Sequence, residues 1–289
     1  MLRHSILALL LARHIHAVQL LTPYPFRSPY DDTIDEDDKD FNNGDPLAID
    51  GSNFPCKLYQ DDNTNPNATD IKATYEAGQS YSITLLGNST FGGGSCQISL
   101  SYDNGQTFKV ISSIEGGCPL NSTYDFTIPN FVPDYSQVLL SWSWFPFLGP
   151  RVMYQNCARV QIGSGSTKRS TRHTRKQRRS YYSKRQATAL EDLPDMFVCD
   201  VGEFGNGCTT IEQRNLIFPD PGDNVVIGQN NETADPGPGY RFPDNSTSST
   251  TSGATTQTTE SSGTSEITAT SSTGVITTAG VNYHYIKHF

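Results

Sequence analysis

Cysteine and histidine are the side chains of this 289-residue chain that could hold a metal ion or take part in redox chemistry. No two of the six cysteines have the Cys-x-x-Cys spacing that is typical of a metal site. The cysteines are Cys56, Cys96, Cys118, Cys157, Cys199 and Cys208. Four of the histidines are scattered over the start of the chain, a basic stretch and the C-terminal region: His14, His173, His284 and His288. An even number of cysteines without metal spacing predicts disulfides.

Six cysteines allow 15 disulfide connectivities, so their spacing alone does not fix the pairing. We favour the pairs Cys56–Cys157, Cys96–Cys118 and Cys199–Cys208. The last two pairs close short loops across Gly-rich turns. Because disulfides persist in oxidising compartments, these cysteines indicate an exported protein.

The first residues have the features of a secretory signal. Arg3 precedes an apolar run from Ile6 to Ala12, which is too short to span a bilayer. Ala17 is a suitable residue directly before a signal-peptide cleavage site. Cleavage after it would remove residues 1–17 and leave Val18 as the start of the mature chain. Five Asn-x-Ser/Thr sequons support export and predict N-glycosylation: Asn67, Asn88, Asn121, Asn231 and Asn245. We therefore expect a secreted glycoprotein, extracellular or in the cell wall, with no membrane span.

Charge and composition limit the partners. The net charge of -9 argues against nucleic acid as a partner, and only 18% of the residues are charged. Abundant Ser, Thr, Asn, Gly and Pro suit turn-rich β structure and polar tails.

Alternating polar and apolar residues predict β-strands in the central part of the chain. Residues 80–86 and 96–102 alternate with period two, and Asp103-Asn104-Gly105 predicts a hairpin turn before a returning strand at 107–111. Further strands are expected at 138–145 and 157–162. Short strands between turn signals indicate an all-β, immunoglobulin-like or fibronectin-like β-sandwich.

Five zones follow from the changes in composition. We expect a signal peptide (1–17), the β-sandwich (18–163), a basic disordered insertion (164–190), a cysteine-containing extension that packs on the sandwich (191–228) and a Ser/Thr-rich disordered tail (229–289). The basic residues of the insertion lie at 168–185. Three interpretations of them stay open: a solvated linker, cleavage by a dibasic-specific protease, and binding to anionic polymers.

Residues 18–228 resemble the fungal chitin-active lytic polysaccharide monooxygenases, which are copper enzymes. The resemblance rests on six segments in order: 50–57, 92–103, 114–119, 142–145, 153–158 and 193–198. It implies a β-sandwich that holds one copper ion between an N-terminal histidine and a second histidine, called the histidine brace. A tyrosine lies near the axial position, and the copper activates an oxygen co-substrate that breaks glycosidic bonds.

Both histidine positions of this brace are substituted. The resemblance aligns the N-terminal histidine with Ala17 and the second histidine with Phe91, and it aligns the axial tyrosine with Tyr154. His16 lies one residue too early, after Ile15. Phenylalanine and alanine have no lone pair with which to bind copper. We therefore expect no cofactor, no metal ligand at Ala17 or Phe91, and no confidently assigned catalytic residue.

Three functions stay open for this scaffold. The first is a catalytically inactive relative, a monomer, that binds chitin or a related cell-wall glucan around the former copper site. The second is a working copper monooxygenase with an unforeseen N-terminus. The third is a structural cell-wall glycoprotein without a glycan ligand.

Two other groups of residues have competing interpretations. Trp142 and Trp144 have the same parity on one strand, so both face either the core or a sugar ligand, and we expect the core. The acidic residues between Asp31 and Asp40 are expected to form a solvated loop, although carboxylates could bind calcium.

Overall fold

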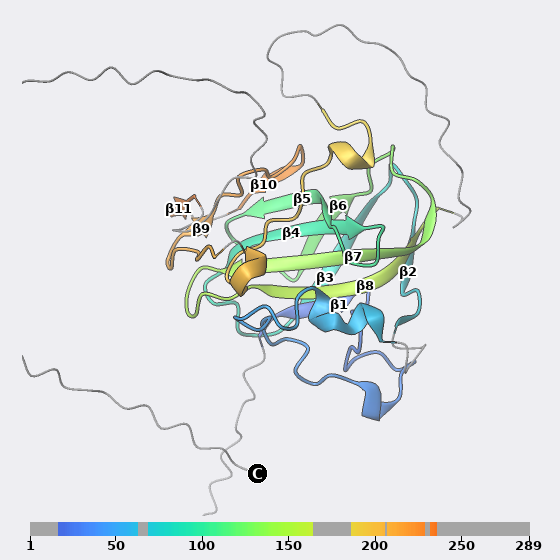
Figure 1. Ribbon diagram of the computed structural model, residues 1–289, viewed down its shortest axis with the longest axis horizontal. Helices are drawn as coiled ribbons and strands as arrows, with labels where there is room; N and C mark the ends of the chain where they lie inside the picture. Colours follow the sequence, from blue (N-terminus) through green and yellow to red (C-terminus); the bar gives the residue numbers. More distant parts are fainter. Residues whose placement is uncertain (1–16, 63–68, 164–185, 206, 229–231, 236–289) are drawn as a thin grey trace, which may run out of the picture. The chain divides into compact units, whose positions relative to one another are not determined.

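Two β-sheets dominate the computed structural model, which describes residues 17–62, 69–163, 186–205, 207–228 and 232–235 (Figure 1). The larger sheet has six strands in the spatial order β10 (Val225–Ile227), β5 (Lys109–Glu115), β4 (Gly94–Ser101), β7 (Tyr135–Pro146), β8 (Tyr154–Ile162) and β2 (Ala73–Tyr75). The smaller sheet has the order β1 (Gln19–Thr22), β3 (Ser80–Leu86) and β6 (Thr123–Thr127). A third, two-stranded sheet consists of β11 (Thr233–Ala234) and β9 (Asn215–Leu216).

Helical structure in the described residues is limited to short 3-10 turns. They are η1 (Glu36–Asp38), η2 (Cys56–Asp61), η4 (Leu190–Asp192) and η5 (Gly202–Gly205). The fold is therefore an all-β sandwich, as the period-two pattern predicts. Among the described residues, no helix is long and apolar enough to cross a membrane.

The core lies between the two sheets. Alternate residues of β4 and β7, including Ile98, Leu100 and Trp142, face alternate residues of β3 and β6 such as Ile83 and Phe126. Because successive side chains of a strand point to opposite faces, this alternation buries one face of each sheet. Trp142 and Trp144 both belong to this core and are fully buried, so they do not stack on a sugar at the surface.

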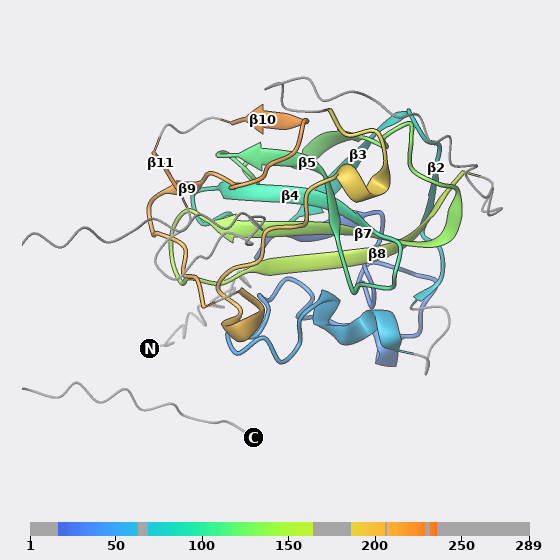
Figure 2. The ribbon, with the colours of Figure 1, turned by 45° about the horizontal axis from the view of Figure 1, so that its top comes forward.

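The outer face of the larger sheet is covered as well. Figure 2 shows the segment that follows η4 running across strands β4 and β7. Its Phe197 N–H donates to the buried Gln97 Oε1 of β4 at 2.8 Å, and its Leu216 carbonyl accepts from Ser95 Oγ at 2.7 Å. A second apolar cluster, including Phe145 and Phe218, fills the space beneath it. Ser95 and Gln97, two buried polar side chains of β4, thus find partners in the chain that covers them.

Three disulfides tie these layers together, and they are the pairs favoured from the sequence. Cys56–Cys157 joins η2 to β8, Cys96–Cys118 lies in the core, and Cys199–Cys208 closes a loop in the covering segment. No cysteine of the chain is left free.

Candidate functional site

A glycine-rich loop directly before β4 holds the residue at the expected second copper position. Phe91 has a φ of 46°, and the following three glycines also have positive φ values. Glycine adopts this left-handed conformation at little cost, whereas phenylalanine does not. A Cβ on Gly94 would collide with the Phe145 carbonyl oxygen. The loop therefore passes close to β7 and presents Phe91 under backbone strain.

Hydrogen bonds dock this loop onto the end of β7. The Gly93 carbonyl accepts from the Phe147 N–H at 2.9 Å and from Trp144 Nε1 at 3.2 Å. The Phe91 carbonyl accepts from the Leu148 N–H at 2.9 Å. These bonds fix the backbone on both sides of the Phe91 side chain.

The ring of Phe91 completes a three-ring aromatic cluster. Its centroid lies 5.9 Å from that of Trp144 and 6.3 Å from that of Tyr154. Trp144 and Tyr154 stack on each other at 4.5 Å. Phe91 is half-buried and Tyr154 is buried. Burial, followed by the nearby charge of Asp45, raises the pKa of the Tyr154 hydroxyl to about 12.

Ala17 lies beside the same loop. It forms a parallel β-bridge with Ser89, two residues before Phe91, and packs against the core. Its carbonyl oxygen lies so close to Gly87 that a side chain there would collide with it. The structure therefore brings the three positions of the expected brace to one end of the sandwich.

The residues at this end do not fit a copper ion. A methyl group at position 17 and a phenyl ring at position 91 offer no lone pair, whereas copper prefers imidazole or thiolate ligands. Within the described ranges, no group of three or more His, Cys, Asp or Glu side chains could hold a metal. All six histidines of the sequence, among them His16 and His173, lie outside these ranges.

Comparison with known proteins identifies the family. The chain is 47% identical over 201 residues to AA11 family lytic polysaccharide monooxygenase A of Aspergillus fumigatus, and the match covers 70% of this chain and 80% of that protein. The chain belongs to the AA11 family of lytic polysaccharide monooxygenases. No family model matches the sequence.

Two further AA11 proteins are similar to this chain. AA11 lytic polysaccharide monooxygenase B of Aspergillus fumigatus is 36% identical over 217 residues, and the AA11 enzyme of Aspergillus oryzae is 38% identical over 202 residues. The matches cover 69% and 64% of this chain. They span only 48% and 44% of these two relatives, about half of their length.

The acidic loop of this AA11 chain is held by ion pairs. Asp31 is buried and pairs with Lys72 at 2.6 Å, and Asp40 pairs with Lys57 at 3.4 Å. Burial favours the neutral form of Asp31, but hydrogen bonds from Lys72 and Thr33 outweigh it and lower the pKa of the carboxyl. Asp31 and Asp40 therefore serve as partners of lysines, and the expectation of a wholly solvated loop was wrong for them.

The other predicted sites are distributed over the chain. Asn88 and Asn121 are exposed, as acceptors of a glycan must be. The sequons at Asn67, Asn231 and Asn245 lie outside the described residues, as do the basic residues of 168–185, residues 1–16 of the expected signal peptide (1–17) and the part of the tail beyond residue 235.

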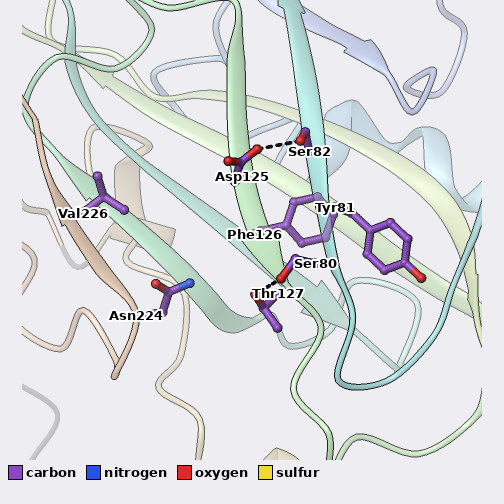
Figure 3. Close-up of a pocket in the computed structure, with 8 residues that line it drawn as sticks. All are labelled: Ser80, Tyr81, Ser82, Asp125, Phe126, Thr127, Asn224 and Val226. Atoms are coloured by element: carbon purple, nitrogen blue, oxygen red, sulfur yellow. Dashed lines mark hydrogen bonds between the residues drawn. The ribbon is translucent and has the colours of Figure 1, made fainter.

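Two surface pockets were not predicted from the sequence. One, of about 400 Å³, is lined by β3, β6, Asn224 and Val226 (Figure 3). Its serine and threonine hydroxyls have partners within the pocket: Ser80 Oγ bonds Thr127 Oγ1 at 2.8 Å, and Ser82 Oγ donates to Asp125 Oδ1 at 2.6 Å. The other lies at the turn after β4 and is lined by residues from four separate segments. Such pockets are formed by segments that are far apart in the sequence, so no local sequence pattern predicts them.

Proposed function

We propose that this AA11 protein is a catalytically silent, secreted relative that binds chitin or a related cell-wall polysaccharide. The observation that carries the proposal is the Phe91 ring, which packs on Trp144 and Tyr154 at the position where the family resemblance expects a copper-binding histidine. The side chain at position 91 is apolar, so it contributes to packing and offers no metal ligand.

The surface around Phe91 supports binding to a polysaccharide. Leu120 is 49% exposed and Leu148 is 41% exposed, and both approach the loop at Gly92 and Gly93. Together with the half-buried Phe91 they form an apolar patch, the Phe91 patch. Apolar surface of this kind suits contact with the apolar faces of packed sugar rings.

Sedimentation with insoluble polysaccharide tests the binding. We expect the secreted protein to sediment with chitin or β-glucan, and Leu148→Asp to reduce the bound fraction strongly. Phe41→Asp is the matched control, because Phe41 is also exposed (56%) but lies in the N-terminal segment next to Asp40. Failure to sediment with chitin, cellulose and β-glucan would leave a structural wall glycoprotein as the function.

N-terminal sequencing and copper calorimetry test the loss of catalysis. We expect a mature chain that starts at Val18 and takes up no stoichiometric copper. One tightly bound copper per chain would overturn the loss of the copper site and favour the alternative, an active monooxygenase, which the tyrosine at position 154 also favours.

A further inference from the structure

The pocket after β4 lies far from the Phe91 patch. Its lining residues Tyr102, Asp103 and Asn104 directly follow the last residue of β4, whereas Phe91 precedes the first. Eight residues of strand separate the two ends by roughly 25 Å at about 3.3 Å per residue. The pocket has a volume of about 450 Å³, which is in the range of small-ligand sites.

One wall of this pocket is aromatic. Tyr102 and Tyr135 stack with their centroids 5.9 Å apart and their planes at 28°. Both rings are half-buried and pack against the core, so their positions are fixed. The Tyr102 hydroxyl donates to the Pro133 carbonyl at 3.1 Å, which anchors its ring further.

Other lining residues are polar and held in place by the protein. Arg159 donates to the Thr69 carbonyl and to Gln137 Oε1, both at 2.8 Å, and to the Gln60 carbonyl at 3.2 Å. Asp103 accepts from Ser101 Oγ at 2.8 Å, and from the N–H of Thr107 at 2.9 Å and its hydroxyl at 2.6 Å. Most hydrogen-bonding capacity of the guanidinium and of this carboxylate is therefore used within the protein.

Gln60 is a buried polar residue of the pocket lining. It is only 7% exposed, and its Oε1 accepts no hydrogen bond from the described part of the chain. Buried polar atoms are rarely left in this state. The oxygen itself is buried, so the contribution of Gln60 to the pocket lining is a fixed polar side chain.

These features select the class of ligand. A free anion would meet two carboxylates, Asp61 and Asp103, and a free cation would meet Arg159. A neutral ligand with many hydroxyls avoids both conflicts, pairs with the exposed amides of Asn104 and Gln137, and lays an apolar ring face on an aromatic side chain. We propose that this pocket is a second saccharide-binding site, independent of the Phe91 patch.

Two sources could supply such a saccharide. One is a free oligosaccharide or the end of a polysaccharide chain. The other is a glycan on the protein itself, because the sequon at Asn67 follows the described residue Asp62 by five positions in the sequence. The Asn67→Gln protein removes the second source and leaves the pocket to an added probe.

Saturation-transfer NMR with three disaccharides tests the proposal: diacetylchitobiose, cellobiose and laminaribiose. We expect at least one of them to bind the Asn67→Gln protein with a dissociation constant of about 1 mM. Tyr135→Ala should weaken binding about tenfold, whereas Tyr135→Phe keeps the stacked ring and should bind within about twofold of the parent. Ile227→Ala is the control for an exposed residue on β10, at the opposite edge of the sheet from β8 and β2.

A second variant tests the pocket without disturbing the core, because Tyr135 packs against the core and its loss could affect folding. Gln137 is exposed, and Gln137→Ala removes one partner of Arg159 without opening the core. It should also weaken binding severalfold. Saturation transfer from none of the three disaccharides, or transfer that survives both Tyr135→Ala and Gln137→Ala, would overturn the proposal. Sedimentation that depends on Leu148 tests the Phe91 patch separately, so the two proposals fail independently.

Discussion

The ring of Phe91 lies 6.3 Å from the ring of Tyr154, with an angle of 32° between their planes. The tyrosine expected near the copper in this AA11 family thus packs beside an apolar side chain instead of a second metal ligand. Tyr154 is 4% exposed and stacks on Trp144. The aromatic cluster therefore explains the retention of Tyr154 by packing alone.

The first prediction concerns the restoration of a metal site. Phe91→His alone should bind no stoichiometric copper, because Ala17 still offers no imidazole. Phe91→His combined with Ala17→His, in a chain cut directly before residue 17, should take up about one copper per chain in calorimetry. Uptake of one equivalent by the unmodified protein would contradict the assignment of Ala17 and Phe91 as the lost ligands.

The second prediction separates strain from packing at position 91. Phe91→Ala loses the ring contacts but keeps the left-handed φ of 46°, so it should destabilise the fold by about 2 kcal/mol. Phe91→Gly also loses the ring, but glycine tolerates this φ and should recover about 1 kcal/mol. Urea unfolding of both variants measures the difference. Equal stabilities would show that the backbone relaxes at this position.

The chemistry of the site was predictable from residue types, but its geometry was not. The substitutions at Ala17 and Phe91 are visible in the sequence, and three glycines after Phe91 signal an unusual turn. The contact between Phe91 and Tyr154 depends on how β4 and β8 are placed on either side of β7. Such long-range pairing is a property of the whole sheet, so local patterns do not reveal it.

The third prediction concerns alkaline stability. The pKa of Tyr154 is raised to about 12, from about 10 in an unfolded chain. Because the folded pKa is the higher one, the stabilisation is fully present below about pH 10 and is lost as the pH rises through about 12. At about pH 11 the free energy of unfolding of the unmodified protein should have fallen by about 1 kcal/mol through this group. The Tyr154→Phe variant has no such hydroxyl and should not show this fall.

Chemical unfolding at about pH 9 and about pH 11, followed by tryptophan fluorescence, measures this loss. Tyr24→Phe is the control, because Tyr24 is 37% exposed. An identical pH dependence for Tyr154→Phe and the unmodified protein would contradict the burial of the hydroxyl.

The strands were predictable where alternation is long. Residues 80–86 were expected as a strand and form β3 with the same bounds, and the strand expected at 138–145 lies within β7. Strands β1, β2 and β10 have four residues or fewer, and their conformation is set by the neighbour to which they bond. β6 alternates Tyr124 and Phe126 toward the core, a pattern too short to predict a strand by itself.

The fourth prediction tests how the covering segment is attached to the outer face of β4. Gln97→Leu removes the acceptor of the buried Phe197 N–H, so it should cost about 1–3 kcal/mol of unfolding free energy. Gln161→Leu, in the half-exposed part of β8, loses one bond to the Gly163 carbonyl and should cost less than about 0.5 kcal/mol. Faster hydrogen exchange of the Phe197 N–H in the Gln97→Leu variant would show that the loss of stability arises at this hydrogen bond.

The fifth prediction concerns the glycan expected at Asn88. This exposed sequon lies three residues before Phe91, so a glycan there would cover part of the Phe91 patch. In protein from a glycosylating fungal host, Asn88→Gln and Thr90→Ala both remove the sequon and should each increase sedimentation with chitin severalfold. Thr90→Ser keeps the sequon and nearly the same side chain, so it should bind like the unmodified protein. If Thr90→Ser rose together with the other two variants, the gain would come from the changed loop and not from the missing glycan.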